Sequence, residues 1–157
     1  EIAGATFSGH PWGAGTTVTI SVHDTSHPAM KPFGKEFQIK DEIYQYKPET
    51  YVGGDKLRVL VSLDLNTEQT MKPLNRNEGL KKQYTEGGRT VPVSWIRTFE
   101  GGRVFYTNLG HNASTYWNPA VLQHYLDGLQ YALGDLTADA TPSSKITREE
   151  VLAPPAP

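Results

Sequence analysis

The chain has 157 residues, which corresponds to about one domain with a sizeable hydrophobic core. Its net charge is −2 and its charged residues are scattered, so the composition argues against a nucleic-acid partner or a basic membrane surface, and no apolar run is long enough to predict membrane insertion. Cysteine is absent, which excludes disulfides, thiolate metal sites and a cysteine nucleophile within the chain and leaves its localisation undetermined.

The first half of the chain predicts strands. Residues 1–12 contain many glycines and little alternation, which predicts a loop. Residues 16–24 and 36–46 alternate apolar and polar side chains, as half-buried strands do. Residues 57–63 form the most apolar run and predict a central strand. Residues 66–90 carry charges and glycine with little periodicity, so we expect a long mobile loop there.

The second half predicts a hairpin followed by a helix. Residues 91–97 and 103–108 are rich in β-branched and aromatic side chains and flank Glu100-Gly101-Gly102, which predicts two antiparallel strands joined by a glycine turn. Asn118 then predicts the cap of an amphipathic helix, and Gly134 its end. His124 falls within this helix, where we expect it to face solvent. The apolar residues that recur at helical spacing are Leu122, Tyr125, Leu126, Leu129, Ala132 and Leu133.

One histidine stands between the last strand and the helix. His111 follows the strand, at the edge where open α/β sheets bind ligands, so we predict a pocket residue that acts as a base or metal ligand. The alternative is a ring whose nitrogens bond to the loop backbone. His10, between Gly9 and Pro11, could approach the same pocket. Two histidines do not complete a metal site, so we expect no cofactor, with a divalent ion at His10 and His111 as the alternative.

Two acidic residues and a tyrosine form the next candidate group. Neighbours on a strand face opposite sides, so at most one of Asp41 and Glu42 points into a pocket, as a general acid, a base or an acceptor for sugar hydroxyls. The alternative is an exposed pair at a strand end. Tyr44 lies on the same face as Glu42, where it would stack on a sugar or pack against the protein.

Loop side chains near the histidines are candidates for sugar binding, since flat apolar rings suit carbohydrate and amides suit hydroxyl groups. For Trp117, packing against the final helix is the favoured interpretation. The candidates are Trp12, Asn108, Asn112, Tyr116 and Trp117.

Several ordered motifs within residues 1–135 resemble the carboxyl-terminal part of the trehalose-utilisation (ThuA-like) family. They are Phe7-Ser8-Gly9-His10-Pro11, His27-Pro28, Asp41-Glu42-Ile43-Tyr44, Pro92-Val93-Ser94-Trp95, the run from Gly102 to Asn112, and Trp117-Asn118-Pro119. The resemblance implies an α/β fold, a flavodoxin-like sheet of the class I glutamine amidotransferase type with a β-rich excursion. The amino-terminal βαβ half of that fold has no counterpart in the chain, so we expect a fragment of a longer, multidomain bacterial protein.

The resemblance also implies a function in carbohydrate metabolism. His111 resembles in position the histidine that acts as the base for the catalytic cysteine in amidotransferases, although in this chain no acidic residue stands two positions after His111. We predict a hydrolase or isomerase that acts on a disaccharide or keto-sugar derivative. His111, His10 and Glu42 are the expected catalytic residues. Substrate binding is expected from Trp12, Asp41, Tyr44, Asn108, Asn112 and Trp117.

An alternative function is a non-catalytic module of a larger protein that binds carbohydrate or interacts with other polypeptides. The expected partner is therefore a small carbohydrate, with self-association or contact with other domains of the parent chain as further expectations. Residues 136–157 are rich in alanine, proline, serine and threonine, which predicts a linker or tail after a domain at 1–135.

Overall fold

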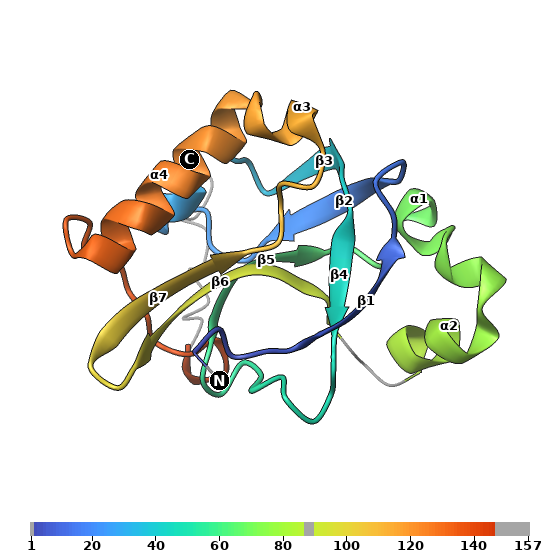
Figure 1. Cartoon of the computed structure of the whole chain (residues 1–157), viewed down its shortest axis with the longest axis horizontal. Coiled ribbons are helices and arrows are strands. Elements are labelled where there is room, and N and C mark those ends of the chain that lie inside the picture. Colours follow the sequence, from blue (N-terminus) through green and yellow to red (C-terminus); the bar gives the residue numbers. More distant parts are fainter. Residues whose placement is uncertain (1, 87–89, 147–157) are drawn as a thin grey trace, which may run out of the picture.

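The computed structural model describes residues 2–86 and 90–146, which form a mixed α/β structure around a five-stranded antiparallel sheet. The strand order is β3-β2-β5-β6-β7. A separate two-stranded antiparallel sheet pairs β1 with β4, and Figure 1 shows β4 running across the direction of β2 and β5. The strands are β1 (Phe7–Trp12), β2 (Thr17–Val22), β3 (Glu36–Lys40), β4 (Ile43–Tyr46), β5 (Arg58–Leu63), β6 (Pro92–Phe99) and β7 (Gly102–Thr107).

The helices lie on two sides of the sheets. In Figure 1, α4 runs along one side of the molecule, where it packs on β7, and α1 and α2 lie at the opposite side. Within the described ranges, none of the helices has both the length and the apolar character needed to cross a bilayer. The helices are α1 (Glu68–Met71), α2 (Glu78–Thr85), α3 (Ala113–Tyr116) and α4 (Pro119–Leu133), with 3-10 turns η1 (Pro28–Met30), η2 (Leu74–Arg76) and η3 (Ser143–Lys145).

The strand predictions for residues 16–24, 57–63 and the hairpin are confirmed. β5 is buried along almost its whole length and pairs with β2 on one side and β6 on the other, as a central strand should. β6 and β7 are joined through Glu100 and Gly101, whose φ angles are 49° and 81°. Positive φ at both central residues is the conformation of a type I′ hairpin turn, which matches the twist of the flanking strands.

Two loop predictions are wrong. Residues 7–12 form β1, because β4 supplies a pairing partner more than thirty residues away in the chain. Residues 66–86 contain α1, η2 and α2 in place of a mobile loop. α2 is fixed locally by Asn77, whose side chain accepts a hydrogen bond from the Leu80 amide. The single alternating segment at 36–46 becomes two strands, β3 and β4, in different sheets.

The predicted ends of α4 are confirmed. Asn118 Oδ1 accepts hydrogen bonds from the amides of Ala120 and Val121, which satisfies two of the free donors at the first turn. Gly134 ends the helix in the left-handed conformation with φ of 97°.

The predicted buried face of α4 is wrong. Its four leucines, at 122, 126, 129 and 133, are 44–77% exposed. The helix packs through a different face, which contains Val121, His124, Gly128 and Tyr131. Both faces have helical spacing, so periodicity alone could not choose between them. Gly128 decides the choice, because it lets the helix backbone approach the ring of Phe105 on β7.

His124 is fully buried in this face, against the expectation that it faces solvent. Its Nδ1 lies 3.0 Å from the Ala29 carbonyl oxygen and therefore carries the proton. Its Nε2 lies 2.9 Å from Ser94 Oγ, whose proton is shared with the Tyr106 carbonyl oxygen 2.8 Å away. Burial lowers the pKa of His124 to about 4, so the ring is neutral at pH 7.

Part of the predicted tail packs against the sheet. Ser143 donates its backbone N–H to the Leu57 carbonyl and accepts the Val59 amide through its hydroxyl oxygen. The buried Arg58 forms ion pairs with Asp24 at 2.6 Å and Asp139 at 3.3 Å. Residues 136–146 are therefore held against β5. The domain boundary at residue 135 stays a prediction, and residues 147–157 lie outside the described ranges.

We expect Gly128→Ala to lower the free energy of unfolding by about 1–3 kcal/mol, the usual cost of overpacking. An alanine Cβ at this position would stand 2.4 Å from the Phe105 ring. Gly79→Ala in α2 is the matched control, because its nearest neighbour, Asn77 Oδ1, would be 3.4 Å away and alanine favours helix by about 0.5–1 kcal/mol. Urea unfolding measures both variants, and equal effects would contradict close packing at Gly128.

We expect stability to fall as the pH drops from 6.5 to 4. The pKa of His124 is about 4 in the fold and about 6.5 in the unfolded chain, so the unfolded state binds more protons between these values. The stability that depends on a neutral His124 is fully present above pH 6.5, and about 3 kcal/mol of it is lost by pH 4. Burial also lowers the pKa of His27, which adds in the same direction. Urea titrations at several pH values measure the slope, and His124→Gln should flatten it.

Candidate active site

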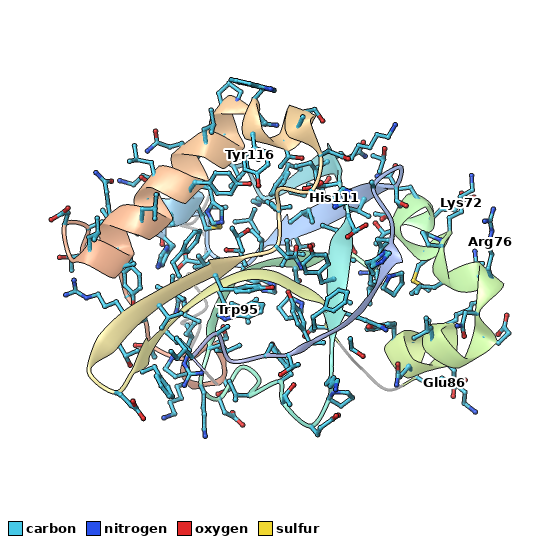
Figure 2. All side chains as sticks on the ribbon, in the orientation of Figure 1. Lys72, Arg76, Glu86, Trp95, His111 and Tyr116 are labelled. Carbon is cyan, nitrogen blue, oxygen red and sulfur yellow. The ribbon has the colours of Figure 1, made fainter. Side chains whose placement is uncertain are left out.

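Three of the predicted catalytic residues lie together. Glu42 contacts two imidazoles at once, His10 through Oε2 at 3.4 Å and His111 through Oε1 at 3.5 Å. The three residues come from β1, from the link between β3 and β4, and from the loop after β7. Figure 2 shows His111 near the end of β4 at which that strand begins, directly after Glu42.

The imidazole rings of His10 and His111 meet Glu42 through the same ring atom. In both histidines Nδ1 faces the carboxylate. Nε2 is the second nitrogen of each ring, and the side chains of His10 and His111 are 53% and 47% exposed, whereas Glu42 is 13% exposed. Because Nδ1 of each ring faces the carboxylate, Nε2 is the ring nitrogen left to meet a bound molecule.

His10 owes its position to an irregular strand. β1 shifts register against β4 on both sides of Gly9, whose φ is 136°. Bulges of this kind re-aim a side chain next to a binding site. The regular alternation expected of β1 is therefore interrupted where His10 must turn toward Glu42.

Asp41 fixes the distance between Glu42 and His111. It is fully buried, and its two carboxylate oxygens accept the amides of Gly110 at 2.7 Å and Asn112 at 2.8 Å. His111 stands between these two amides, and Glu42 is the next residue after Asp41. Two charge-assisted hydrogen bonds therefore connect the two segments that carry the reacting groups. Asp41 supports the site, and its full burial leaves it no surface through which to meet a substrate as predicted.

Asn112 strengthens the same connection. Its Nδ2 donates to the carbonyl oxygens of Ala14 and Lys40, both at 2.8 Å. Both amide protons are thus used within the protein, and the predicted contact of Asn112 with a substrate is limited to its oxygen.

Gly110 is required by the shape of this loop. Its φ is 126°, and a Cβ at this position would meet the hydroxyl oxygen of Tyr116 at 2.8 Å. The loop can therefore close over α3 only with glycine at this position.

Aromatic rings lie beside His10. Phe7 stacks on His10 with ring centroids 6.2 Å apart and meets Tyr44 edge to face at 4.9 Å. Tyr44 was predicted to lie on the face of Glu42, whereas Phe7 was missed because β1 was expected to be a loop. Phe7 is 51% exposed and can contact a bound ring.

Asn108 lies in a buried polar group behind these rings. Its Nδ2 donates to the Tyr46 hydroxyl at 2.9 Å, and that hydroxyl donates to Tyr106 at 3.3 Å. Burial raises the pKa of Tyr46 and of Tyr106 above the ordinary value, so both phenols stay protonated. Asn108 is buried, and no described side chain or backbone group satisfies its Oδ1. Direct contact of Asn108 with a substrate is therefore blocked in this structure.

The two tryptophans have opposite environments. Trp12 is 0% exposed, its indole N–H donates to the Thr70 carbonyl at 2.7 Å, and its ring packs on Tyr84. The prediction that Trp12 binds a substrate is wrong, because the residue belongs to the core. Trp117 is 79% exposed at the end of α3, so the favoured interpretation that it packs on the final helix is also wrong.

A divalent ion at His10 and His111 was the alternative to the expectation of no cofactor. Both contact Glu42. Within residues 2–86 and 90–146, however, no group of three or more histidine and acidic side chains has the arrangement needed to hold a metal ion. The cofactor expectation stays a prediction.

Comparisons with known proteins agree with the sequence motifs. Residues 1–132 match the ThuA family, described as trehalose utilisation. A crystal structure of a ThuA-like protein from Bacteroides uniformis superposes with a TM-score of 0.57 at 18% sequence identity. The match covers 92% of this chain and 53% of that protein, so the chain spans about half of its length. No curated protein matches the sequence.

The predicted fold class is confirmed by this superposition. The structure is mixed α/β with a central sheet, and its structural neighbour is a ThuA-like protein, whose fold is of the glutamine amidotransferase type. All strand pairs in the described ranges are antiparallel, which corresponds to the predicted β-rich part of that fold.

We expect Asp41→Asn to lower the free energy of unfolding by about 1–3 kcal/mol, because an amide can accept only one of the two N–H groups and turns a donor toward the other. Amide hydrogen exchange should accelerate at Gly110 and Asn112. Asp64→Asn is the control, since a single oxygen of Asp64 accepts both bonds from Asn66 and an amide keeps that acceptor. Unchanged exchange at Gly110 and Asn112 in Asp41→Asn would contradict this role.

Proposed function

The chain belongs to the trehalose utilisation (ThuA) family, and on that premise we propose that it is an enzyme that acts on a carbohydrate by general acid and base catalysis. The observation that carries the proposal is the shared contact of His10 and His111 with Glu42. The family supports a carbohydrate-related role, and a carboxylate beside two imidazoles supplies side chains of the kind that serve as general acids and bases.

Each of the three residues has a separate role in this proposal. Glu42 holds both rings by Nδ1 and stabilises the positive charge that forms when an imidazole takes up a proton. One imidazole removes a proton from the substrate with its Nε2 atom, and the other imidazole donates a proton to the substrate from its own Nε2 atom. The exposure of both rings supports access of a polar molecule from solvent.

The arrangement of carboxylates supports proton transfer over glycoside hydrolysis. Most glycosidases use two carboxyl groups on either side of the scissile bond. Here Glu42 is the partly exposed carboxylate of the pair, whereas Asp41 is fully buried and accepts two backbone amides. A base and an acid on either side of one carboxylate suit the movement of a proton between adjacent carbons of a keto-sugar. Isomerisation is thus the better supported of the two predicted reaction classes.

Substrate binding is assigned to the aromatic residues beside the imidazoles. Phe7 and Tyr44 meet edge to face next to His10 and offer apolar ring surfaces to the C–H groups of a sugar. Trp117 supplies a further exposed ring. The reaction as proposed requires no metal or organic cofactor, because all of its proton transfers use side chains of the chain itself.

A second candidate function is a non-catalytic module that binds carbohydrate or another polypeptide. The exposed leucines of α4 favour it, since large exposed apolar patches commonly mark contact surfaces. Saccharide binding without any product over long incubation would support this alternative.

We expect Glu42→Gln to reduce turnover of a keto-sugar or disaccharide by about 10²–10⁴-fold, the usual contribution of a positioned acid or base, while the chain stays folded. His111→Ala and His10→Ala should each give a comparable loss. Glu86→Gln is the matched control, because it makes the same chemical change at an exposed helix end, where Glu86 pairs only with Lys82 among the described residues. Product formation is followed by chromatography and folding by circular dichroism.

The two functions give different outcomes in this experiment. Equal turnover in Glu42→Gln and in the parent chain would remove the three residues from the mechanism. Absence of product from every variant and from the parent, with saccharide binding retained, would replace the enzyme proposal by the binding module.

A further inference from the structure

A cavity lies at the end of β4 away from Glu42. Its volume is about 250 Å³, and we call it the tyrosine pocket. Three tyrosines from separate segments line it, together with an amide side chain and the start of β6. The residues that define it are Gln45, Tyr46, Tyr51, Tyr84, Thr90 and Pro92.

The described residues of the lining are uncharged and include several flat rings. Tyr46 and Tyr51 lie nearly parallel, with an interplanar angle of 19° and centroids 6.3 Å apart. Gln45 contributes its amide through two long bonds of 3.3 Å, one to the Ser8 carbonyl and one from the Tyr84 hydroxyl. An amide has two N–H groups and two lone pairs, so Gln45 keeps hydrogen-bonding capacity for a ligand.

We propose that the tyrosine pocket binds one neutral pyranose ring. The phenol rings would contact the C–H faces of the sugar, and Gln45 and Thr90 would bond to its hydroxyl groups. The choice of a sugar as ligand rests on the proposed function, whereas the choice of a neutral one rests on the uncharged side chains among the described lining residues. Among the described residues of the wall, none would compensate a phosphate or carboxylate group.

The pocket is separate from the three reacting groups. Glu42 directly precedes β4, whereas Gln45 and Tyr46 end it, so three or four residues at about 3.3 Å each separate the two sites. The hydroxyl of Tyr46 is hydrogen-bonded within the protein, to Asn108 and Tyr106. A sugar in the tyrosine pocket would therefore be bound without touching His10 or His111.

A negatively charged sugar would be better stabilised in a second cavity, which has a basic lining. Lys72 and Arg76 line a different cavity with Gln69 and Thr17. Figure 2 shows Lys72 and Arg76 at the side of the molecule that carries α1 and α2, far from Trp95. Glucose and glucose 6-phosphate thus distinguish the tyrosine pocket from this basic cavity.

The chain contains its own reporters for the tyrosine pocket. Trp95 lies edge-on to Tyr46 at 5.4 Å and to Tyr51 at 6.4 Å, and Trp12 lies edge-on to Tyr84 at 5.7 Å. Both indoles are fully buried, so a ligand reaches them only through the tyrosines. Trp117→Phe removes the one exposed tryptophan of the three in the chain.

The experiment titrates glucose and trehalose into the full chain carrying Trp117→Phe and follows tryptophan emission. We expect a saturable change that glucose 6-phosphate does not produce. Adding Tyr51→Ala should weaken binding about tenfold, and Tyr51→Phe, which keeps the ring, should restore it to within about threefold. Tyr116→Ala is the matched control, because Tyr116 is half exposed on α3 and should leave the affinity unchanged.

The outcomes separate this proposal from the proposed function. Glu42→Gln should leave the emission change intact while it removes turnover. If the parent chain shows the emission change but no turnover at all, only the proposed enzymatic function is contradicted. An emission change that is equal in Tyr51→Ala and the parent, or that glucose 6-phosphate produces equally, would overturn the tyrosine pocket. The lack of any response to neutral sugars at millimolar concentration would also overturn it. Thermal melting of each variant shows whether a loss of binding reflects unfolding.

Discussion

The buried carboxylate of Asp41 is the constraint on which the candidate site depends. Its two oxygens hold the amides on either side of His111, while the chain places Glu42 directly after it. The position of one side chain therefore sets the spacing between a carboxylate and an imidazole that come from segments almost seventy residues apart. A site assembled from loops acquires in this way the rigidity usually supplied by regular elements. The charged acceptor makes this restraint stronger than two neutral hydrogen bonds would be.

β4 connects the two regions to which we assign chemistry. The residue before the strand carries the carboxylate shared by the histidines, and its last two residues enter the tyrosine pocket. Alternation along the strand directs Glu42, Tyr44 and Tyr46 to one side, where aromatic neighbours surround them. Short as it is, this strand places polar and aromatic groups at a fixed separation. Its pairing with an irregular β1 also delivers His10 to the same face.

The sequence predicted those parts of the structure that depend on local chemistry. Asn118 and Gly134 determine the ends of α4 through caps and backbone preference, and the glycine turn at residue 101 determines the hairpin. The grouping of His10, Glu42 and His111 was also predicted, although their catalytic role stays a prediction. Sequence patterns failed where distant contacts decide. β1 forms only because β4 pairs with it, and Trp12 is buried by α1 and α2, in a segment whose helices have little periodicity.

The outward row of leucines on α4 has a practical consequence for the molecule in solution. The residues at 122, 126, 129 and 133 follow a four-three-four spacing, the seam pattern that suits contact with another apolar surface. Attraction between such surfaces is mainly entropic near room temperature and weakens on cooling. Any association through this stripe would therefore be weakest in the cold and strongest on warming.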